Sequence, residues 1–177
     1  THKKMAPQGV ETILVNAAEC EPLLKVDYFL VNEYLDKMVR ALECLLDATG
    51  AKEGIIGIKG KNIKSDRVKS LKNDRIRVQE IPDIYPVGDE VILTYEVLGK
   101  IVPEGRIPLS VGVVIVNAET LLNIAQAMDG HPVTEKYVSI AGDVEKTVTL
   151  LVPVGMAILD VLKLAGVTDL TGKRVIN

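Results

Sequence analysis

The chain has 177 residues, of which 47% are hydrophobic and 3% aromatic. This length supports one hydrophobic core, or a core and a small satellite domain. The 21 basic and 24 acidic residues give a net charge of −3 without a basic stripe, which argues against a nucleic-acid partner. The apolar stretches are shorter than the roughly 20 residues of a transmembrane helix, so the sequence predicts no direct membrane span.

Cys20 and Cys44 are the two cysteines, and neither has a neighbouring cysteine or histidine at metal-ligand spacing. We therefore expect neither a disulfide framework nor a metal site. The lack of a signal-peptide pattern favours a reducing, cytoplasmic location. The start without methionine and an expected strand at Lys173, close to the end, suggest a fragment of a longer protein.

Strand and helix patterns alternate over residues 1–130, beginning with the β-branched run "ETILVNA". A long helix follows, and we expect Asp27 to cap its start and Gly50 to close its end. The expected strands cover residues 11–17, 54–60, 75–81 and 111–116. The expected helices cover residues 27–48, 65–71, 89–98 and 118–128. This alternation predicts an α/β domain with a mainly parallel sheet.

The pattern changes after "DGHP", and we place a domain boundary at residues 130–132. Two strands at 135–144 and 146–153 are expected to form a hairpin that turns near residues 142–143. A helix at 156–165 and a strand from Lys173 would follow. This β-β-α-β order predicts a small β-grasp-like module over residues 131–177.

Polar residues follow three of the predicted strands, in "VNAAECEP", "YPVGDEV" and "VNAET". The carboxyl ends of parallel strands lie along one edge of a sheet, and ligands bind there. We therefore expect the three stretches to converge. Side chains alternate in an extended segment, so Glu19 and Glu21 are expected to point one way and Cys20 the other.

These residues also have structural explanations. Asp89 and Glu90 suit the positive end of a helix dipole, an effect of about 0.3–1 kcal/mol. Asn117 suits a helix N-cap, worth about 1 kcal/mol. The structural explanation is weaker for Glu19 and Glu21, because the long helix is expected to begin well after them.

Three longer stretches carry a family resemblance: "PQGVETILVNAAECEPLLKVDYFL", "YPVGDEVILTYEVLGKIVPEGRIPLSVGVVIVNAETL" and "HPVTEKYVSIAGDVEKTVTLLVPVGMAILDVLKLAG". Together they resemble RnfC, the NADH-facing subunit of the Rnf electron transport complex, and the RnfC-like protein associated with proline reductase. More distantly, the chain is similar to the flavoprotein subunit of respiratory complex I, whose matching stretch is Asn-Ala-Asp-Glu-x-Glu-Pro.

The resemblance implies an FMN/NADH-binding α/β domain over residues 1–130, followed by a β-grasp module of the SLBB type over 131–177. It also implies iron-sulfur clusters in a part of the protein outside this sequence, other redox subunits as partners, and a cytoplasmic location. Peripheral attachment to the membrane through those subunits is left open. The chemistry implied is hydride transfer from NADH to FMN, followed by electron transfer to the iron-sulfur centres.

The resemblance also implies the site residues, with no catalytic acid or base among them. The cofactor-binding positions that match are Lys4, Asn16, Glu19, Glu21, Tyr85, Gly88, Asp89, Glu90, Asn117 and Thr120. In this scheme Lys4 binds phosphate, Glu19 shapes the flavin pocket, and Glu21 and Glu90 orient the dinucleotide.

The sequence departs from the family pattern in two places. The family's glycine-rich phosphate loop would precede Thr1 and is not in this sequence, so we expect this chain alone to bind FMN weakly. Ala18 stands where the complex I pattern has an acidic residue. The alternative function is a non-catalytic RnfC-like docking module, linked to proline reductase in one version, with an unused flavin site.

Overall fold

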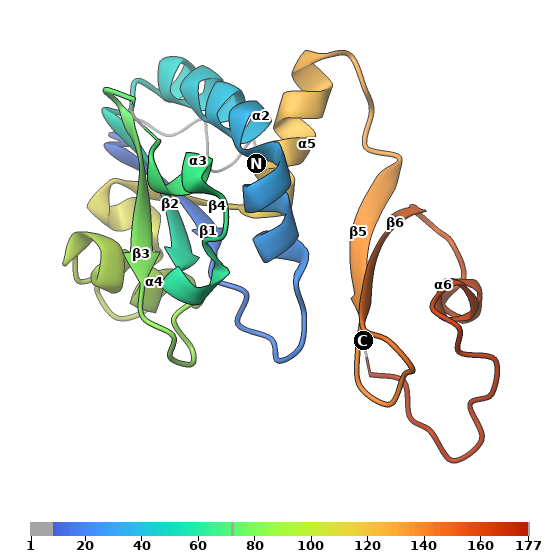
Figure 1. Cartoon of the computed structure of the whole chain (residues 1–177). Coiled ribbons are helices and arrows are strands. Elements are labelled where there is room, and N and C mark those ends of the chain that lie inside the picture. Colours follow the sequence, from blue (N-terminus) through green and yellow to red (C-terminus); the bar gives the residue numbers. More distant parts are fainter. Residues whose placement is uncertain (1–8, 72, 177) are drawn as a thin grey trace.

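A four-stranded parallel sheet forms the centre of the computed structural model, which describes residues 9–71 and 73–176. Its strands are β1 (Thr12–Ala17), β2 (Glu53–Lys59), β3 (Ile76–Ile81) and β4 (Val113–Asn117). They lie in the order β3-β2-β1-β4, and every neighbouring pair is parallel (Figure 1). The predicted α/β class with a mainly parallel sheet is confirmed. The chain first moves outward from β1 to β3 and then returns to the other side of β1 as β4.

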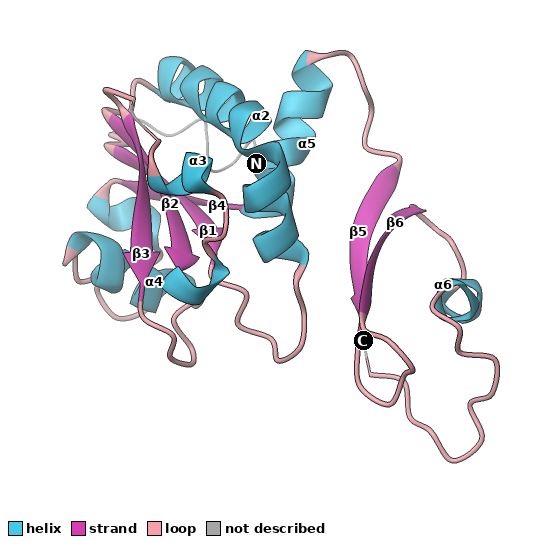
Figure 2. Ribbon diagram, in the orientation of Figure 1, coloured by secondary structure: helices cyan, strands magenta, loops and turns pink. Residues whose placement is uncertain are grey.

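Helices cover both faces of this sheet (Figure 2). The α2 (Val26–Thr49) and α5 (Ala118–Met128) helices pack together on one face. The α4 helix (Glu90–Leu98) lies against the opposite face. The connections contain the short helix α3 (Asp66–Lys69) and two 3-10 turns, η1 (Gly60–Asn62) and η2 (Pro108–Val111).

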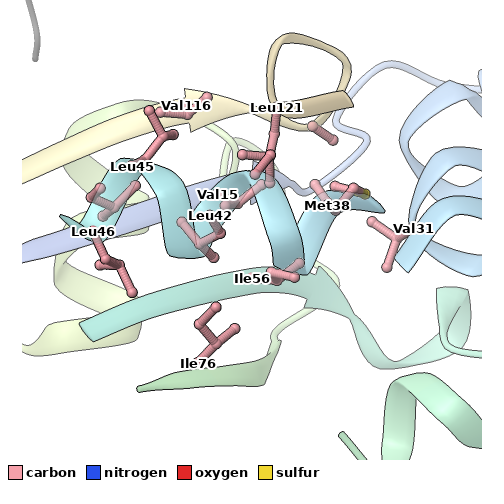
Figure 3. Close-up of a cluster of buried hydrophobic side chains, with 14 of the residues drawn as sticks. Val15, Val31, Met38, Leu42, Leu45, Leu46, Ile56, Ile76, Val116 and Leu121 are labelled. Carbon is pink, nitrogen blue, oxygen red and sulfur yellow. The ribbon is translucent and has the colours of Figure 1, made fainter. Parts of the chain in front are cut away.

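The alternation of side chains along β1 divides the core in two. Ile13 and Val15 belong to the cluster beneath α2 and α5, part of which is drawn in Figure 3. Leu14 belongs to the cluster beneath α4. Because both faces are covered, the strands are apolar nearly throughout, as is usual for parallel sheets. The same alternation places Asn16, two residues after Leu14, on the α4 face at the end of the strand.

The long helix α2 begins differently from the prediction. Its N-terminal residue Lys25 makes no side-chain capping bond, and the predicted cap, Asp27, lies inside the first turn. The carboxylate of Glu19 instead accepts hydrogen bonds from the backbone N–H groups of Asp27, at 2.7 Å, and Tyr28, at 3.3 Å. The expected end is confirmed, because Gly50 has φ 71° and donates its N–H to the carbonyl of Leu46.

The chain beyond α5 forms a second, smaller unit. Antiparallel strands β5 (Glu135–Ile140) and β6 (Val148–Pro153) make a hairpin, and α6 (Ile158–Leu164) follows. Ile140, Val152 and Val161 form its small core. The strand predicted from Lys173 is wrong, since residues 173–176 are not in a strand. The β-grasp identity of this unit therefore stays a prediction, although its hairpin-then-helix order fits.

Strand β5 contacts the first unit along its outer edge (Figure 1). The backbone N–H of Tyr137 donates to the Glu119 carboxylate at 2.8 Å, and Lys136 forms an ion pair with the same carboxylate at 2.7 Å. The hydroxyl groups of Tyr137 and Tyr34 are 3.0 Å apart. The boundary placed at residues 130–132 falls in the connection between α5 and β5.

Candidate functional site

The three polar stretches meet at the carboxyl edge of the sheet. Asn16 of β1 lies directly opposite Asn117 of β4 in the parallel register. The Asn16 amide group donates a hydrogen bond of 2.8 Å to the carbonyl of Gly88, which precedes α4. The predicted convergence is therefore present, and it joins residues that are 72 positions apart in the chain.

Asn16 holds the geometry of this edge with both ends of its amide. While its nitrogen binds Gly88, its oxygen accepts the backbone N–H of Ala18 at 3.1 Å. The strand end and the loop before α4 are thus fixed to each other. Asn16 contributes to the site first by holding two chain segments together.

Gly88 packs so closely against the end of β1 that a side chain there would collide with it. Its N–H donates to the Cys20 sulfur at 2.9 Å. A Cβ atom on Gly88 would lie 2.6 Å from that sulfur and 3.2 Å from the Cβ of Ala18. The close approach of the loop to the strand end requires glycine at this position.

Glu19 does not belong to an extended segment, so the predicted alternation of Glu19, Cys20 and Glu21 is wrong. Its φ of 44° is left-handed, and the strand already ends at Ala17. Its carboxylate is taken up by the N-terminus of α2, and burial raises the pKa of this carboxyl group. Cys20 is half-buried against the α4 cluster, and Glu21 is exposed.

The side chains that remain accessible at this edge come from two loops. Glu21 is exposed after β1, and the Tyr85 side chain before α4 is 83% exposed. Glu90, the first residue of α4, is half-buried. Among the predicted site residues, these are placed to meet a molecule arriving from solvent.

Two other predicted residues cap helices, as their structural explanation requires. The carboxylate of Asp89 accepts the N–H groups of Val91, at 2.9 Å, and Ile92, at 3.2 Å, at the start of α4. The Asn117 side chain accepts the N–H of Glu119 at 2.9 Å at the start of α5. Capping fixes where each helix begins, which also sets the positions of the neighbouring loops.

The N-terminus of α5 has the chemistry of a phosphate site. Its first-turn N–H groups point outward along the helix axis, and an anion is stabilised there. Thr120 adds a half-buried hydroxyl group in this first turn. The carboxylate of Glu119, which would repel an anion, is engaged by Lys136 and by the Tyr137 backbone. Lys4, the predicted phosphate ligand, lies outside the described residues.

Sequence reasoning missed one residue at this edge, Lys59. It ends β2, is only 6% exposed, and forms an ion pair with Asp83 at 3.2 Å. Its ammonium group also donates to the carbonyl of Glu19 at 3.3 Å. The signal was a lysine at the end of an otherwise apolar strand, where a side chain on this face of the sheet is buried.

The largest surface hollow lies elsewhere. It has a volume of about 250 Å³ and is lined mainly by apolar side chains such as Val91, Tyr95 and Ile101. Lys100, also in its lining, donates to the carbonyl of Val111, before β4, and pairs with Glu11, before β1. The hollow is therefore on the side of the amino ends of the strands, away from the three converging stretches.

Membrane-spanning helices and metal-binding clusters are both absent from residues 9–71 and 73–176. No helix in these ranges is long and apolar enough to cross a membrane. In the same part of the chain, no three histidine, cysteine or acidic side chains gather closely enough to bind a metal ion.

Comparison with known proteins identifies the class. The family model described as the Nuo51 FMN-binding domain matches residues 1–126. The chain is 42% identical over 178 residues to cobalamin reductase PduS of Salmonella typhimurium, covering 99% of this chain and 39% of that protein. It is 31% identical over 174 residues to a subunit of the Na(+)-translocating ferredoxin:NAD(+) oxidoreductase complex of Acetobacterium woodii, covering 94% of this chain and 39% of that protein.

A solved structure shows the same fold. The crystal structure of an NAD+-reducing [NiFe]-hydrogenase in the air-oxidized state matches with a TM-score of 0.74 at 21% identity, over 92% of this chain and 34% of that chain. The fold and the carboxyl-edge site are thus those of a flavoprotein-type FMN-binding domain. The chain belongs to the Nuo51 FMN-binding domain family and, within it, to the RnfC relatives. It spans about 39% of the length of the Salmonella and Acetobacterium relatives.

Proposed function

We propose that this chain is the flavin-binding part of an electron-transfer protein, in which FMN accepts hydride from NADH and electrons pass on to iron-sulfur centres in other parts of the assembly. The observation that carries the proposal is the convergence of the β1 end, the loop before α4 and the N-terminus of α5 at one sheet edge. This edge, in a chain of an FMN-binding family, is where an α/β sheet binds a nucleotide.

The residues of this chain have binding and orienting roles in the proposal. The N-terminus of α5 and Thr120, with Lys4, would hold the FMN phosphate. Asn16 and Gly88 would keep the two loops in place beside the ring system, and Tyr85 is the aromatic side chain nearest to α4 in this loop. Bound FMN supplies the hydride and electron chemistry, and the protein needs no acid-base pair.

The exposed and half-buried carboxylates would face the dinucleotide. Glu21 and Glu90 come from different loops, and both reach the surface at the carboxyl edge. Carboxylates accept hydrogen bonds from the amide and hydroxyl groups that a nicotinamide dinucleotide carries. Glu19 would act from behind them, since its side chain caps α2.

The proposal extends to the rest of the protein. The relatives named as subunits belong to multisubunit complexes, which favours partner redox subunits and peripheral attachment to the cytoplasmic face of a membrane through them. We place the flavin domain at residues 1–130 and an SLBB-type β-grasp module at 131–177. The small hairpin unit with its docked β5 strand supports this division.

The test uses the full-length protein that carries this chain. Bound flavin gives visible absorbance bands, and NADH mixed with the protein should bleach them. Glu21→Gln and Glu90→Gln should each lower kcat/KM for NADH by roughly tenfold to a hundredfold, the consequence of losing a hydrogen bond to a charged group in the transition state. Glu96→Gln, on the exposed side of α4, is the matched control.

Two results would count against this function. A full-length protein without flavin bands that cannot be loaded with FMN would favour the alternative, a docking module with an unused site. Unchanged NADH oxidation in both the Glu21 and Glu90 variants would remove these residues from the dinucleotide site.

A second candidate concerns the final acceptor. The 42% identity to a protein named cobalamin reductase is higher than the 31% identity to the Acetobacterium relative, which favours delivery of electrons to a cobalamin. NADH-dependent reduction of an oxidised cobalamin, followed by its absorbance, separates this from delivery to ferredoxin. A proline-reductase link would instead require electron transfer to that enzyme.

A further inference from the structure

Lys59 is a buried cation with no assigned role at the carboxyl edge. Its side chain lies on the same face of the sheet as Asn16, because Lys59 follows by two residues Gly57, the β2 partner of Asn16. Only 6% of Lys59 is exposed. Burying an ammonium group is unfavourable unless it is paired and hydrogen-bonded, so its partners are informative.

The two partners of Lys59 come from the two loops that carry Glu21 and Glu90. The ammonium nitrogen is 3.3 Å from the carbonyl oxygen of Glu19 in the β1–α2 loop. It is 3.2 Å from a carboxylate oxygen of Asp83 in the β3–α4 loop. Lys61 pairs with the other carboxylate oxygen of Asp83, and the two lysines hold the pKa of Asp83 below its usual range.

Glu19 is thereby fixed at both ends. Lys59 binds its carbonyl group, while the α2 N-terminus binds its carboxylate. Its left-handed φ of 44° is unfavourable for a residue with a side chain and needs such support. The direction in which the chain leaves Glu19 decides where Glu21 lies.

We propose that Lys59 is a positioning residue of the cofactor site, whose ammonium group ties the β1–α2 loop to the β3–α4 loop so that Glu21 and Glu90 face one opening. The inference rests on the proposed function. Lys59 acts through Glu19 and Asp83, and it is not itself assigned a contact with FMN or dinucleotide.

The test compares three variants of the full-length protein. Lys59→Met removes the charge and keeps the length of the side chain, and Lys59→Arg keeps the charge. Lys69→Met, an exposed lysine on α3, is the matched control. FMN affinity is measured by quenching of flavin fluorescence, and loop order by amide hydrogen exchange of residues 18–21 and 84–89 in the FMN-free protein.

The expected result is faster exchange in both loops and FMN binding weaker by about tenfold in Lys59→Met, as losing one charged hydrogen bond implies. Lys59→Arg should recover most of the affinity, and Lys69→Met should match the wild type. Unchanged FMN affinity in Lys59→Met, with or without faster exchange, would overturn the positioning role, as would failure of Lys59→Arg to recover it.

Two further arms keep the outcomes distinct. If Lys59→Met does not fold, Asp83→Asn removes the half-exposed partner and should change loop exchange and FMN affinity in the same direction by a smaller factor; no change in either would overturn the inference. If the wild type binds no FMN, the proposed function fails, and unlinked exchange of the two loops in the variants would then overturn the tie itself.

Discussion

At the scale of single residues, the polar side chains that follow the strands are used mainly by the protein itself. Asn16 joins two loops, while Asp89 and Asn117 cap helices. Glu19 caps a helix that begins several residues later. A cofactor site built this way depends on residues that need not contact the cofactor, because they decide where the contacting groups lie.

Gly88→Ala tests the close contact between the loop and the strand end. The new methyl group would lie 2.6 Å from the Cys20 sulfur, so the loop must move. We expect a lower melting temperature and weaker FMN binding. Adding Cys20→Ala should recover part of both losses, because it removes the closest clash; strictly additive losses in the double variant would contradict this explanation.

Glu19→Ala tests the capping role. Loss of a helix cap costs about 0.5–2 kcal/mol, so the free energy of unfolding in urea should fall by about this amount. Glu33→Ala, exposed in the second turn of the same helix, is the control and should stay within about 0.5 kcal/mol of the wild type. Equal stability of the two variants would show that the α2 N-terminus does not need Glu19.

At the scale of elements, the start of α2 lies among acidic groups. Burial, followed by the nearby Glu19 charge, raises the pKa of Asp27 from its usual 3.8 to about 7. Glu119 adds to the rise, while a hydrogen bond from the Glu19 backbone and the charge of Lys136 oppose it. The first turn of α2 is therefore coupled to both α5 and β5 through charge.

Asp27→Asn tests this coupling through pH. Because the folded state has the higher pKa, Asp27 contributes most stability below about pH 4, and this contribution is lost as pH rises towards 7. The slope from one such group is at most about 1.4 kcal/mol per pH unit. Unfolding free energies measured between these pH values should depend less on pH in Asp27→Asn, which cannot ionise. Identical slopes would contradict the raised pKa.

At the scale of the whole molecule, the hairpin unit is attached through a small polar junction. Tyr137 contributes its backbone N–H to Glu119 and its hydroxyl group to Tyr34, which lies at a non-helical position within α2. Phe29 packs against both tyrosine rings. The contact also keeps the Glu119 carboxylate away from the α5 N-terminus.

Tyr137→Phe tests how firmly the two units are joined. Loss of the hydroxyl hydrogen bond should reduce stability by about 0.5–1.5 kcal/mol and speed proteolysis in the connection between α5 and β5. Tyr95→Phe, an exposed tyrosine on α4, should leave both unchanged. Unchanged cleavage in Tyr137→Phe would mean that other contacts hold the junction.

The hydrophobic pattern predicted the first unit closely. The predicted helix at residues 118–128 coincides with α5, and the four predicted strands of the sheet fall within a few residues of β1 to β4. Strong periodicity produces this agreement, since it reports directly which side of an element is buried. The strand predicted at Lys173 is wrong, because a short β-branched segment carries no information on whether a pairing partner is near.

The sequence by itself determined the α/β alternation, the strand ends at which polar residues gather and, through family resemblance, the flavin-binding class. Only the tertiary structure decided what each polar group does. Glu19 caps α2, and Lys59 binds the carbonyl of Glu19 from 40 residues away. Periodicity records burial along one element, whereas the partner of a buried charge is chosen by distances between loops that come together only in the folded chain.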